Sequence, residues 1–215
     1  MPTSYPTTVK DLQDCYSLGA FQRFTKCIEE SSKSNSLRVR GVKITNPECK
    51  NPVCCCVPLR DASKGVVIVD KKGYPKKNDH QDRIPTEILE DFEKKMAGYS
   101  KTFTTFEELF DDVVTHSGVR PCLMIYDFCL RYGHYIHLKP KDKVYLFKGA
   151  KAGAESYFGC SIKPYRISTS SFRPDFPAKF ESHYIEDFLC VCCDHIAYIR
   201  KNHPTTLPTS SAIIP

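Results

Sequence analysis

Residues 122–130 constrain the fold of this 215-residue chain more than any other part of its sequence. They read Cys-Leu-Met-Ile-Tyr-Asp-Phe-Cys-Leu, so a helix formed by them is apolar on nearly every side. Such a helix is stable only when other elements cover it all round. Pro121 stands just before it, and proline fits the first turn of a helix. The sequence therefore predicts a central, buried helix that begins near Pro121.

Further helices are predicted on both sides of this segment. Apolar residues recur at helical spacing within residues 84–98 and 104–117. The second stretch opens with two overlapping Thr-x-x-Glu sequences, and each is typical of a capping box at a helix start. Additional helices are expected at about 10–30, 150–158 and 177–200.

The expected fold class is α+β. Residues 37–75 hold β-branched and alternating stretches bounded by turn residues, which favours two or three antiparallel strands. The fold is then a mostly helical bundle with a small N-terminal antiparallel sheet. We expect an N-terminal helix with a small β-rich annex over residues 1–83, a helical domain over 84–200, and a disordered tail over 201–215.

The cysteines and the apolar runs indicate the compartment. The chain has 12 cysteines, and its first twenty residues lack the basic start and apolar core of a secretory signal. Reduced thiols and an intracellular location, cytoplasmic or nuclear, are therefore expected. No apolar run approaches the ~20 residues of a membrane-spanning helix, so no membrane partner is expected. The oligomeric state is left open by the sequence.

One cysteine cluster suits a metal site in part. Cys49 and the run 54–56 lie in a segment with proline and lysine, and zinc takes four such ligands. Cys15, Cys27 or His80 would have to complete the shell. The alternative, a strand with mixed thiol burial, is favoured, so no metal and no cofactor are predicted.

Positive charge is densest in residues 138–174, which hold eight basic and two acidic residues. Clustered cations attract phosphate by charge and counterion release, and aromatic side chains between them can stack on bases. The pattern therefore indicates binding of nucleic acid or another polyanion. A solvated face that balances the acidic helices is the alternative. The interleaved aromatic residues are Tyr145, Phe147, Tyr157, Phe158, Tyr165 and Phe172.

A six-residue turn, residues 116–121, joins two of the predicted helices. Backbone N–H groups at the start of a helix attract phosphate, and Arg120 adds a charged donor there. Together with the lysine-rich stretch that follows the second helix, this turn is predicted to hold a phosphodiester. The predicted nucleic-acid-binding residues are Gly118, Val119, Arg120, Lys141, Lys143, Lys148 and Lys151.

These residues also carry a family resemblance. The sequence Gly-Val-Arg-Pro at 118–121, before an apolar helix, resembles the hairpin of helix-hairpin-helix DNA glycosylases. Residues 125–133 and 140–154 are similar to proteins with an 8-oxoguanine DNA glycosylase fold. The resemblance covers about residues 104–160 and implies DNA repair, with DNA favoured over RNA as the partner.

The resemblance also implies site residues. The carboxylate of the family falls at Asp142, which would stabilise a cationic sugar or orient a water. The hairpin lysine of bifunctional members falls near Cys122, which cannot form a Schiff base. Base excision would therefore be monofunctional. Arg120 replaces the second glycine of the usual turn and resists the positive φ that glycine allows.

Several functions stay open at this point. The first is base excision by Asp142. Asp142 has an alternative interpretation as a surface acid between two lysines. A non-enzymatic module for nucleic acid or polyanions is the second function, and a zinc-assisted protein-interaction module is the third. No local signature selects a thiol hydrolase. Whether the chain is an enzyme is left undecided by the sequence.

Overall fold

The structure is a computed structural model that describes residues 7–15, 36–39, 42–45, 71, 84–178, 180–209, 211 and 213. Its elements are mostly helical, as predicted, with short antiparallel strand pairs. The helices are α1 (Val9–Cys15), α3 (Thr86–Met96), α4 (Phe106–Ser117), α5 (Leu123–Tyr135), α6 (Lys148–Phe158), α7 (Ser182–Val191) and α8 (Cys193–Asn202). The strands are β1 (Ser36–Val39), β2 (Val42–Thr45), β3 (Lys143–Tyr145) and β4 (Arg166–Ser168), and two 3-10 turns are η2 (Thr169–Phe172) and η3 (Pro204–Thr206).

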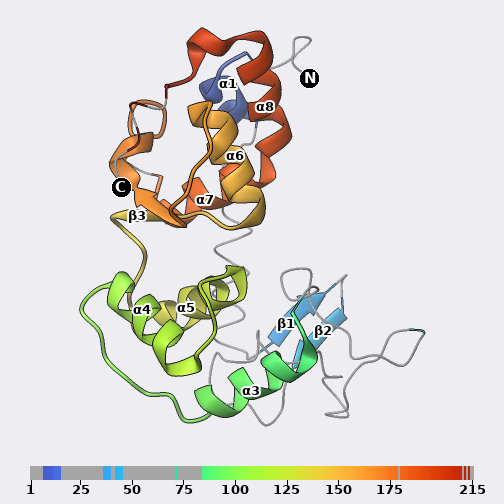
Figure 1. The fold of residues 1–215 in the computed structure, drawn as a ribbon, viewed down its shortest axis with the longest axis vertical. Coiled ribbons are helices and arrows are strands. Elements are labelled where there is room, and N and C mark those ends of the chain that lie inside the picture. The colour runs from blue at the N-terminus through green and yellow to red at the C-terminus, as the bar shows by residue number, and fades with distance from the viewer. Residues whose placement is uncertain are drawn as a thin grey trace. The chain divides into compact units, whose positions relative to one another are not determined.

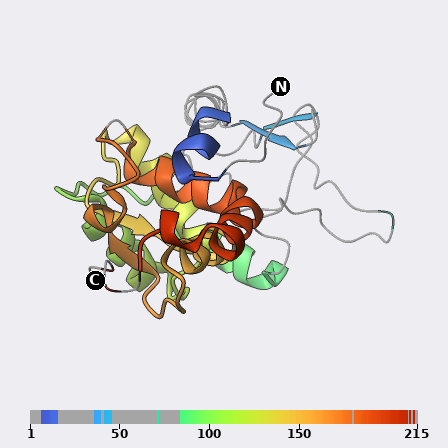
Figure 2. The same ribbon diagram turned by 90° about the horizontal axis from the view of Figure 1, so that it is seen from above.

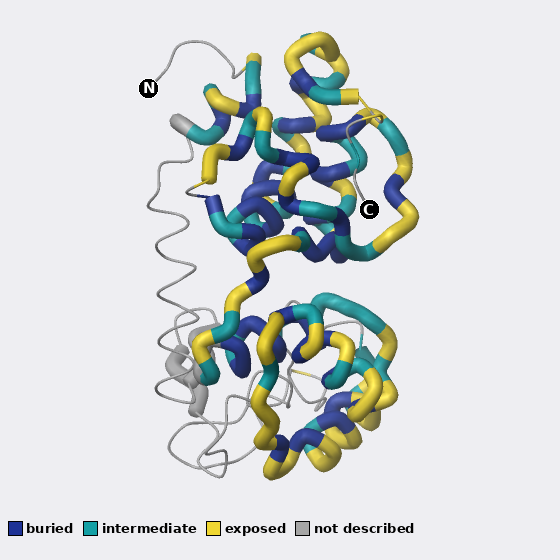
Figure 3. Tube along the Cα trace, turned by 90° about the vertical axis from the view of Figure 1, so that its left-hand side faces the viewer, coloured by how far each residue is buried: buried dark blue, intermediate teal, exposed yellow. Residues whose placement is uncertain are grey.

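The chain forms two compact units. Residues 1–23 and 140–215 make up the first unit, and residues 24–139 make up the second. In both, Figure 3 shows buried residues alternating with exposed and partly exposed ones along the chain. The division expected from the sequence has its boundaries at residues 83 and 200, and it stays a prediction.

The first unit is built around α6, which packs against both α7 and α8 (Figure 1). Its small residues allow this close packing. A methyl group at Gly153 would lie 2.0 Å from the carbonyl oxygen of Leu189, and one at Gly149 would lie 2.6 Å from Cys190 Sγ. The helix backbones therefore meet at a distance that only glycine permits.

Helix α1 joins the same core, and Figure 2 shows it beside the C-terminal helices of the unit. Val9 and Leu12 are buried there, and Gln13 Nε2 donates to the carbonyl of Asp175 at 3.1 Å. The centre of the core is aromatic, with edge-to-face and tilted ring pairs that include Phe158, Phe172, Phe176 and Phe188.

Strand β3 pairs antiparallel with β4, with Val144 opposite Ile167 and Tyr145 opposite Arg166. Val144 and Ile167 are fully buried against the helices. Because side chains alternate along a strand, Lys143 and Arg166 fall on the other face of this small sheet. The sheet thus fixes the start of the lysine-rich stretch against the core.

The second unit holds the buried helix that the sequence predicts. In α5, Met124, Ile125, Tyr126, Phe128 and Cys129 are all less than 2% exposed. Helix α4 packs against it and begins with a capping box, as predicted. Thr105 is the N-cap, and its hydroxyl accepts from the N–H of Glu108 at 3.1 Å while that carboxylate accepts from the Thr105 N–H at 3.2 Å.

The expectation of one long helix over 177–200 is corrected. The segment forms α7 and α8, which meet at Cys192 with φ −98° and ψ 11°. The hydrogen bonds from Cys192 N to Phe188 O and from Ile196 N to Cys192 O continue across the junction. The bend lets both helices pack on α6, which a straight helix of this length would not do.

The segment after α8, where the sequence predicts a disordered tail, forms η3 and buries Leu207. Arg200 holds it, because the guanidinium donates to the carbonyls of Pro204 and Pro208 at 3.3 and 2.6 Å. The predicted β region, residues 37–75, contains most of β1 and all of β2, which pair with each other. Nearly all of the rest of that region lies outside the described residues. The packing of an N-terminal sheet beside the helices stays a prediction, and most of the predicted helix 10–30 lies outside the described residues.

Candidate nucleic-acid interface

Four of the predicted binding residues lie on one continuous stretch of the first unit, which we call the lysine segment (residues 141–151). It runs from a loop through β3 into α6. Lys141 and Lys148 are exposed, and Lys143 and Lys151 are partly exposed. Lys148 is the first residue of α6, and Lys151 lies in the first turn of that helix.

Buried hydroxyl groups fix the start of the lysine segment. Ser182 Oγ donates to the carbonyl of Lys141 at 2.7 Å, and Thr169 Oγ1 lies 3.0 Å from the same oxygen. The N–H of Thr169 also donates to the carbonyl of Asp142 at 2.8 Å. Because these bonds hold the backbone inward, the side chains of Lys141 and Asp142 are left at the surface, where both are exposed.

Asp142, the residue predicted to act in catalysis, is exposed on this loop between Lys141 and Lys143. A carboxylate that stabilises a forming oxocarbenium ion works best in a site that excludes water, because water screens its charge. The exposed position is that of a surface acid between two lysines. Base excision by Asp142 stays a prediction.

Two other charged residues of this range, Glu155 and Arg173, form hydrogen bonds within the fold. Glu155 Oε1 accepts from the N–H of Ile162 at 3.1 Å and from Ser161 Oγ at 3.4 Å, so this acid caps a loop. Arg173 Nη1 donates to the carbonyls of Phe176, Pro177 and Phe180. Glu155 is therefore tied to its own loop rather than to a lysine.

The six interleaved aromatic residues separate into two groups. Tyr165 is partly exposed, whereas the other five are at most 9% exposed and belong to the core. The buried five are Tyr145, Phe147, Tyr157, Phe158 and Phe172. Only Tyr165 offers ring surface to a ligand among these six.

The predicted hairpin lies in the second unit and is described there by itself. Gly118 ends α4 with φ 70° and ψ 9°, and its N–H donates to the carbonyl of Val114 at 3.0 Å. The N–H of Val119 donates to Ser117 Oγ at 3.2 Å. Two backbone donors that the sequence assigns to phosphate are thus used within the turn. Arg120 is exposed.

Arg120 does not adopt the positive φ that glycine would allow. Among the described residues other than glycine, only His137 and Lys148 have a positive φ. The left-handed residue of this turn is Gly118, the C-cap of α4. The replacement of the second hairpin glycine by arginine therefore causes no backbone strain in this turn.

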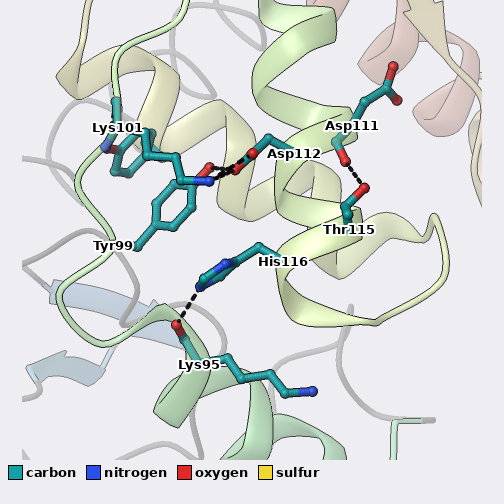
Figure 4. Close-up of polar contacts among 8 residues, drawn as sticks. Lys95, Tyr99, Lys101, Asp111, Asp112, Thr115 and His116 are labelled. Carbon is teal, nitrogen blue, oxygen red and sulfur yellow. Dashed lines mark hydrogen bonds and ion pairs between the residues drawn. The ribbon is translucent and has the colours of Figure 1, made fainter.

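Helix α3 braces the end of α4, as Figure 4 shows for His116. The His116 ring donates from Nε2 to the carbonyl of Lys95 at 3.0 Å, and Lys95 Nζ donates to the carbonyl of Ser117 at 2.8 Å. Lys95 also pairs with Asp91 at 2.8 Å. A cation at the C-terminal end of α4 is favourable because helix carbonyls concentrate negative charge there.

Replacing Gly118 with alanine should lower the free energy of unfolding of the second unit by about 1 kcal/mol. A methyl group at this position meets only Lys95 Nζ, at 3.6 Å, so the cost comes from the positive φ and not from a clash. Urea unfolding measures the change. Gly118→Asn should lose less, since asparagine tolerates the left-handed conformation, and equal losses would contradict the explanation.

A second polar cluster ties the 99–101 loop to α4 (Figure 4). Tyr99 Oη donates to Asp112 Oδ2 at 2.5 Å, and Lys101 Nζ donates to Asp112 Oδ1 at 2.8 Å. Burial and the bond to Asp112 raise the pKa of Tyr99. Burial alone would raise the pKa of Asp112, but the bonds from Lys101 and Tyr99 outweigh it and lower that pKa below its usual value.

Asp112 should make the second unit sensitive to acid. Its pKa is lower in the folded chain than in the unfolded chain, so its contribution to stability is present above about pH 4. That contribution is lost as the pH falls through the lowered pKa. We expect Asp112→Asn to flatten the decline in the free energy of unfolding as the pH falls below about 4. A decline as steep as that of the unchanged chain would contradict this role.

Thiol chemistry is not favoured at the described cysteines of α7 and α8. Burial raises the pKa of Cys190 to about 11 and that of Cys192 to about 12, and it also raises the pKa of Cys193. These groups are protonated near pH 7, whereas the thiolate is the reactive form. Within the described part of the chain, no group of three or more histidine, cysteine or acidic residues suits a metal ion. The cysteine cluster at 49–56, for which zinc is the less favoured interpretation, lies outside the described residues.

Comparison of the chain with protein-family models, curated proteins and solved structures gives no match. Within the described ranges, no helix is both long enough and apolar enough to cross a membrane. Support for the candidate site therefore comes from the structure of this chain alone. The four lysines lie on one stretch of the first unit, and all are exposed or partly exposed. The phosphodiester site that would also use the hairpin stays a prediction.

Proposed function

We propose that the chain binds nucleic acid through the lysine segment of its first unit. The observation that carries the proposal is the anchoring of this segment: its backbone is bonded to buried hydroxyls at one end and is helical at the other. Lysines on an ordered backbone lose less entropy when they bind phosphate than lysines on a disordered chain. Release of counterions from the nucleic acid then drives binding.

Binding is the function that the geometry supports best, ahead of base excision. Binding requires only that lysine side chains at the surface reach phosphates. The exposure of Lys141, Lys143, Lys148 and Lys151 allows this. Excision would require Asp142 to act beside a flipped base, away from water. DNA is the proposed nucleic acid. We also propose an intracellular location for the chain, because free thiols such as those of Cys129 and Cys192 persist in a reducing compartment.

The test is the affinity for a fluorescent 20-nucleotide DNA, measured by anisotropy at 50 mM salt. We expect binding by the unchanged chain and a loss of about 100-fold when all four lysines become glutamine, since each contributes one phosphate contact. Lys10→Gln with Lys201→Gln is the matched control, because both lysines are exposed on the same unit outside the lysine segment. Equal losses in the two variants would reject this site.

Base excision is measured in the same preparations, on duplexes that carry a panel of modified bases. Excision that Asp142→Asn abolishes, with DNA affinity unchanged, would replace the binding proposal with an enzymatic one. Binding with no release of base is the result that we expect.

A further inference from the structure

The ring of Tyr165 lies directly beside the lysine segment. The N–H of Leu146 donates to the carbonyl of Tyr165 at 2.7 Å, so the two chain segments are bonded at this point. The Tyr165 and Phe147 rings are nearly parallel, with 14° between their planes and 5.9 Å between their centroids. At this separation parallel rings are offset and cover only part of each other's face.

Arg166 adds a second planar group at the same place. Its guanidinium carbon lies 5.3 Å from the centroid of the Tyr165 ring, within the range of a cation–π contact. Arg166 is partly exposed and lies opposite Tyr145 in the β3–β4 register. The buried ring of Phe147 thus supports Tyr165, and Arg166 lies over it. We call these three residues the stacking platform.

Phosphate-binding groups border this platform. Lys148 follows Phe147 in the chain and is exposed, and Lys163 precedes Tyr165 by two residues and is exposed as well. An aromatic ring and an arginine plane beside a lysine-lined backbone path are the combination that binds single strands. A base in a duplex is covered by its neighbours on both faces, so it cannot lie on such a ring without leaving the stack.

We propose that Phe147, Tyr165 and Arg166 hold an unpaired base by stacking, and that the preferred ligand of the lysine segment is single-stranded DNA. This inference rests on the proposed function, because the lysines supply the attraction for the backbone. Phe147 keeps the Tyr165 ring in place. Because Arg166 lies over that ring, it moves aside when the base stacks on Tyr165, and its guanidinium then contacts the base or the adjacent phosphate.

The test compares two 12-nucleotide probes with the same number of phosphates. One is oligo(dT), and the other has abasic sugars at every position. Because one stacked base is worth about 1–3 kcal/mol, the unchanged chain should bind oligo(dT) at least about fivefold more tightly than the abasic strand. Tyr165→Leu should reduce that ratio to nearly one and leave the affinity for the abasic strand unchanged.

Two further variants separate stacking from packing. Tyr165→Phe keeps the ring and should keep the preference for oligo(dT). Tyr198→Leu removes another large apolar side chain of the same unit, one that is 40% exposed on α8, and should also keep it. A thermal melt of each variant confirms that it is folded, so a loss of affinity can be assigned to the ring.

The outcomes distinguish the two proposals. Equal binding of oligo(dT) and the abasic strand, with both weakened by the four-lysine change, would overturn the platform and leave the proposed function in place. A Tyr165→Leu variant that keeps its preference for bases would do the same. No binding of either probe at 50 mM salt would overturn both proposals.

Discussion

Replacing Gly153 with alanine is expected to disrupt the packing of α6 on α7. The added methyl group would lie 2.0 Å from the carbonyl oxygen of Leu189 and 2.7 Å from its carbonyl carbon, and both atoms belong to the backbone. A side chain could rotate away, but here one helix must move relative to the other. We expect a loss of about 3 kcal/mol or more in the free energy of unfolding, even though alanine favours the helix more than glycine.

Thermal unfolding should show this loss as a fall in Tm of about 10 °C or more. Hydrogen exchange followed by mass spectrometry should place the loss of protection in peptides from α6 and α7. Ala152→Ser is the matched control, because Ala152 is the exposed neighbour of Gly153 on the same helix. A Gly153→Ala chain as stable as this control would show that the two helices do not meet as described.

The second large effect is expected at Arg200, whose guanidinium joins the end of α6 to the segment after α8. It donates to the carbonyls of Ser156 at 2.9 Å and Pro208 at 2.6 Å, and also to those of Tyr157 and Pro204. Arg200→Met keeps most of the apolar stem but leaves the carbonyls without this donor. We expect a loss of about 3 kcal/mol, since bonds to charged groups contribute about 1.5–3 kcal/mol each and are not additive.

Lysine should not restore what is lost at this position. An ammonium group is a compact charge, whereas the planar guanidinium presents several donors in fixed directions. Urea unfolding of Arg200→Lys should therefore show most of the loss seen with Arg200→Met. Full recovery of stability with lysine would indicate that the positive charge is sufficient and that the hydrogen bonds of the guanidinium group are not required.

Local signals in the sequence predicted much of the second unit. Two overlapping capping-box sequences placed the start of α4 to within one residue, and the structure forms the second, between Thr105 and Glu108. A capping box depends on side chains only three positions apart. The apolar run at 122–130 predicted a buried helix for an equally local reason. In both cases the deciding chemistry lies within one turn of helix.

The features that the sequence did not predict, strand β4 and the bend at Cys192, depend on contacts between segments that are distant in the chain. Strand β4 lies in a stretch that reads as loop, and it forms because residues 166–168 pair with β3, more than twenty positions earlier. The bend at Cys192 depends on the packing of α7 and α8 against α6. Neither partner is visible in the local pattern of hydrophobic residues.

At the candidate site, too, the sequence predicted what depends on residue type and missed what depends on burial in the fold. The sequence identified the lysines as candidate phosphate-binding residues, because the charge of a lysine follows from its residue type. It could not separate Tyr165 from the five buried aromatic residues, since the alternation of aromatic and basic residues is similar for all six. Burial within the first unit makes that distinction. Hydrogen bonds to nearby loops give Arg173 and Glu155 their structural roles.

The most direct test of the account is the salt dependence of binding to oligo(dT). If the four lysines of the lysine segment each contact a phosphate, the logarithm of the association constant should fall with the logarithm of the salt concentration with a slope of about −3. The four-lysine variant should give a slope that is shallower by about 3, because it lacks these four contacts. A steep slope that the variant keeps, or a flat slope in the unchanged chain, would contradict the claim that this segment binds the nucleic-acid backbone.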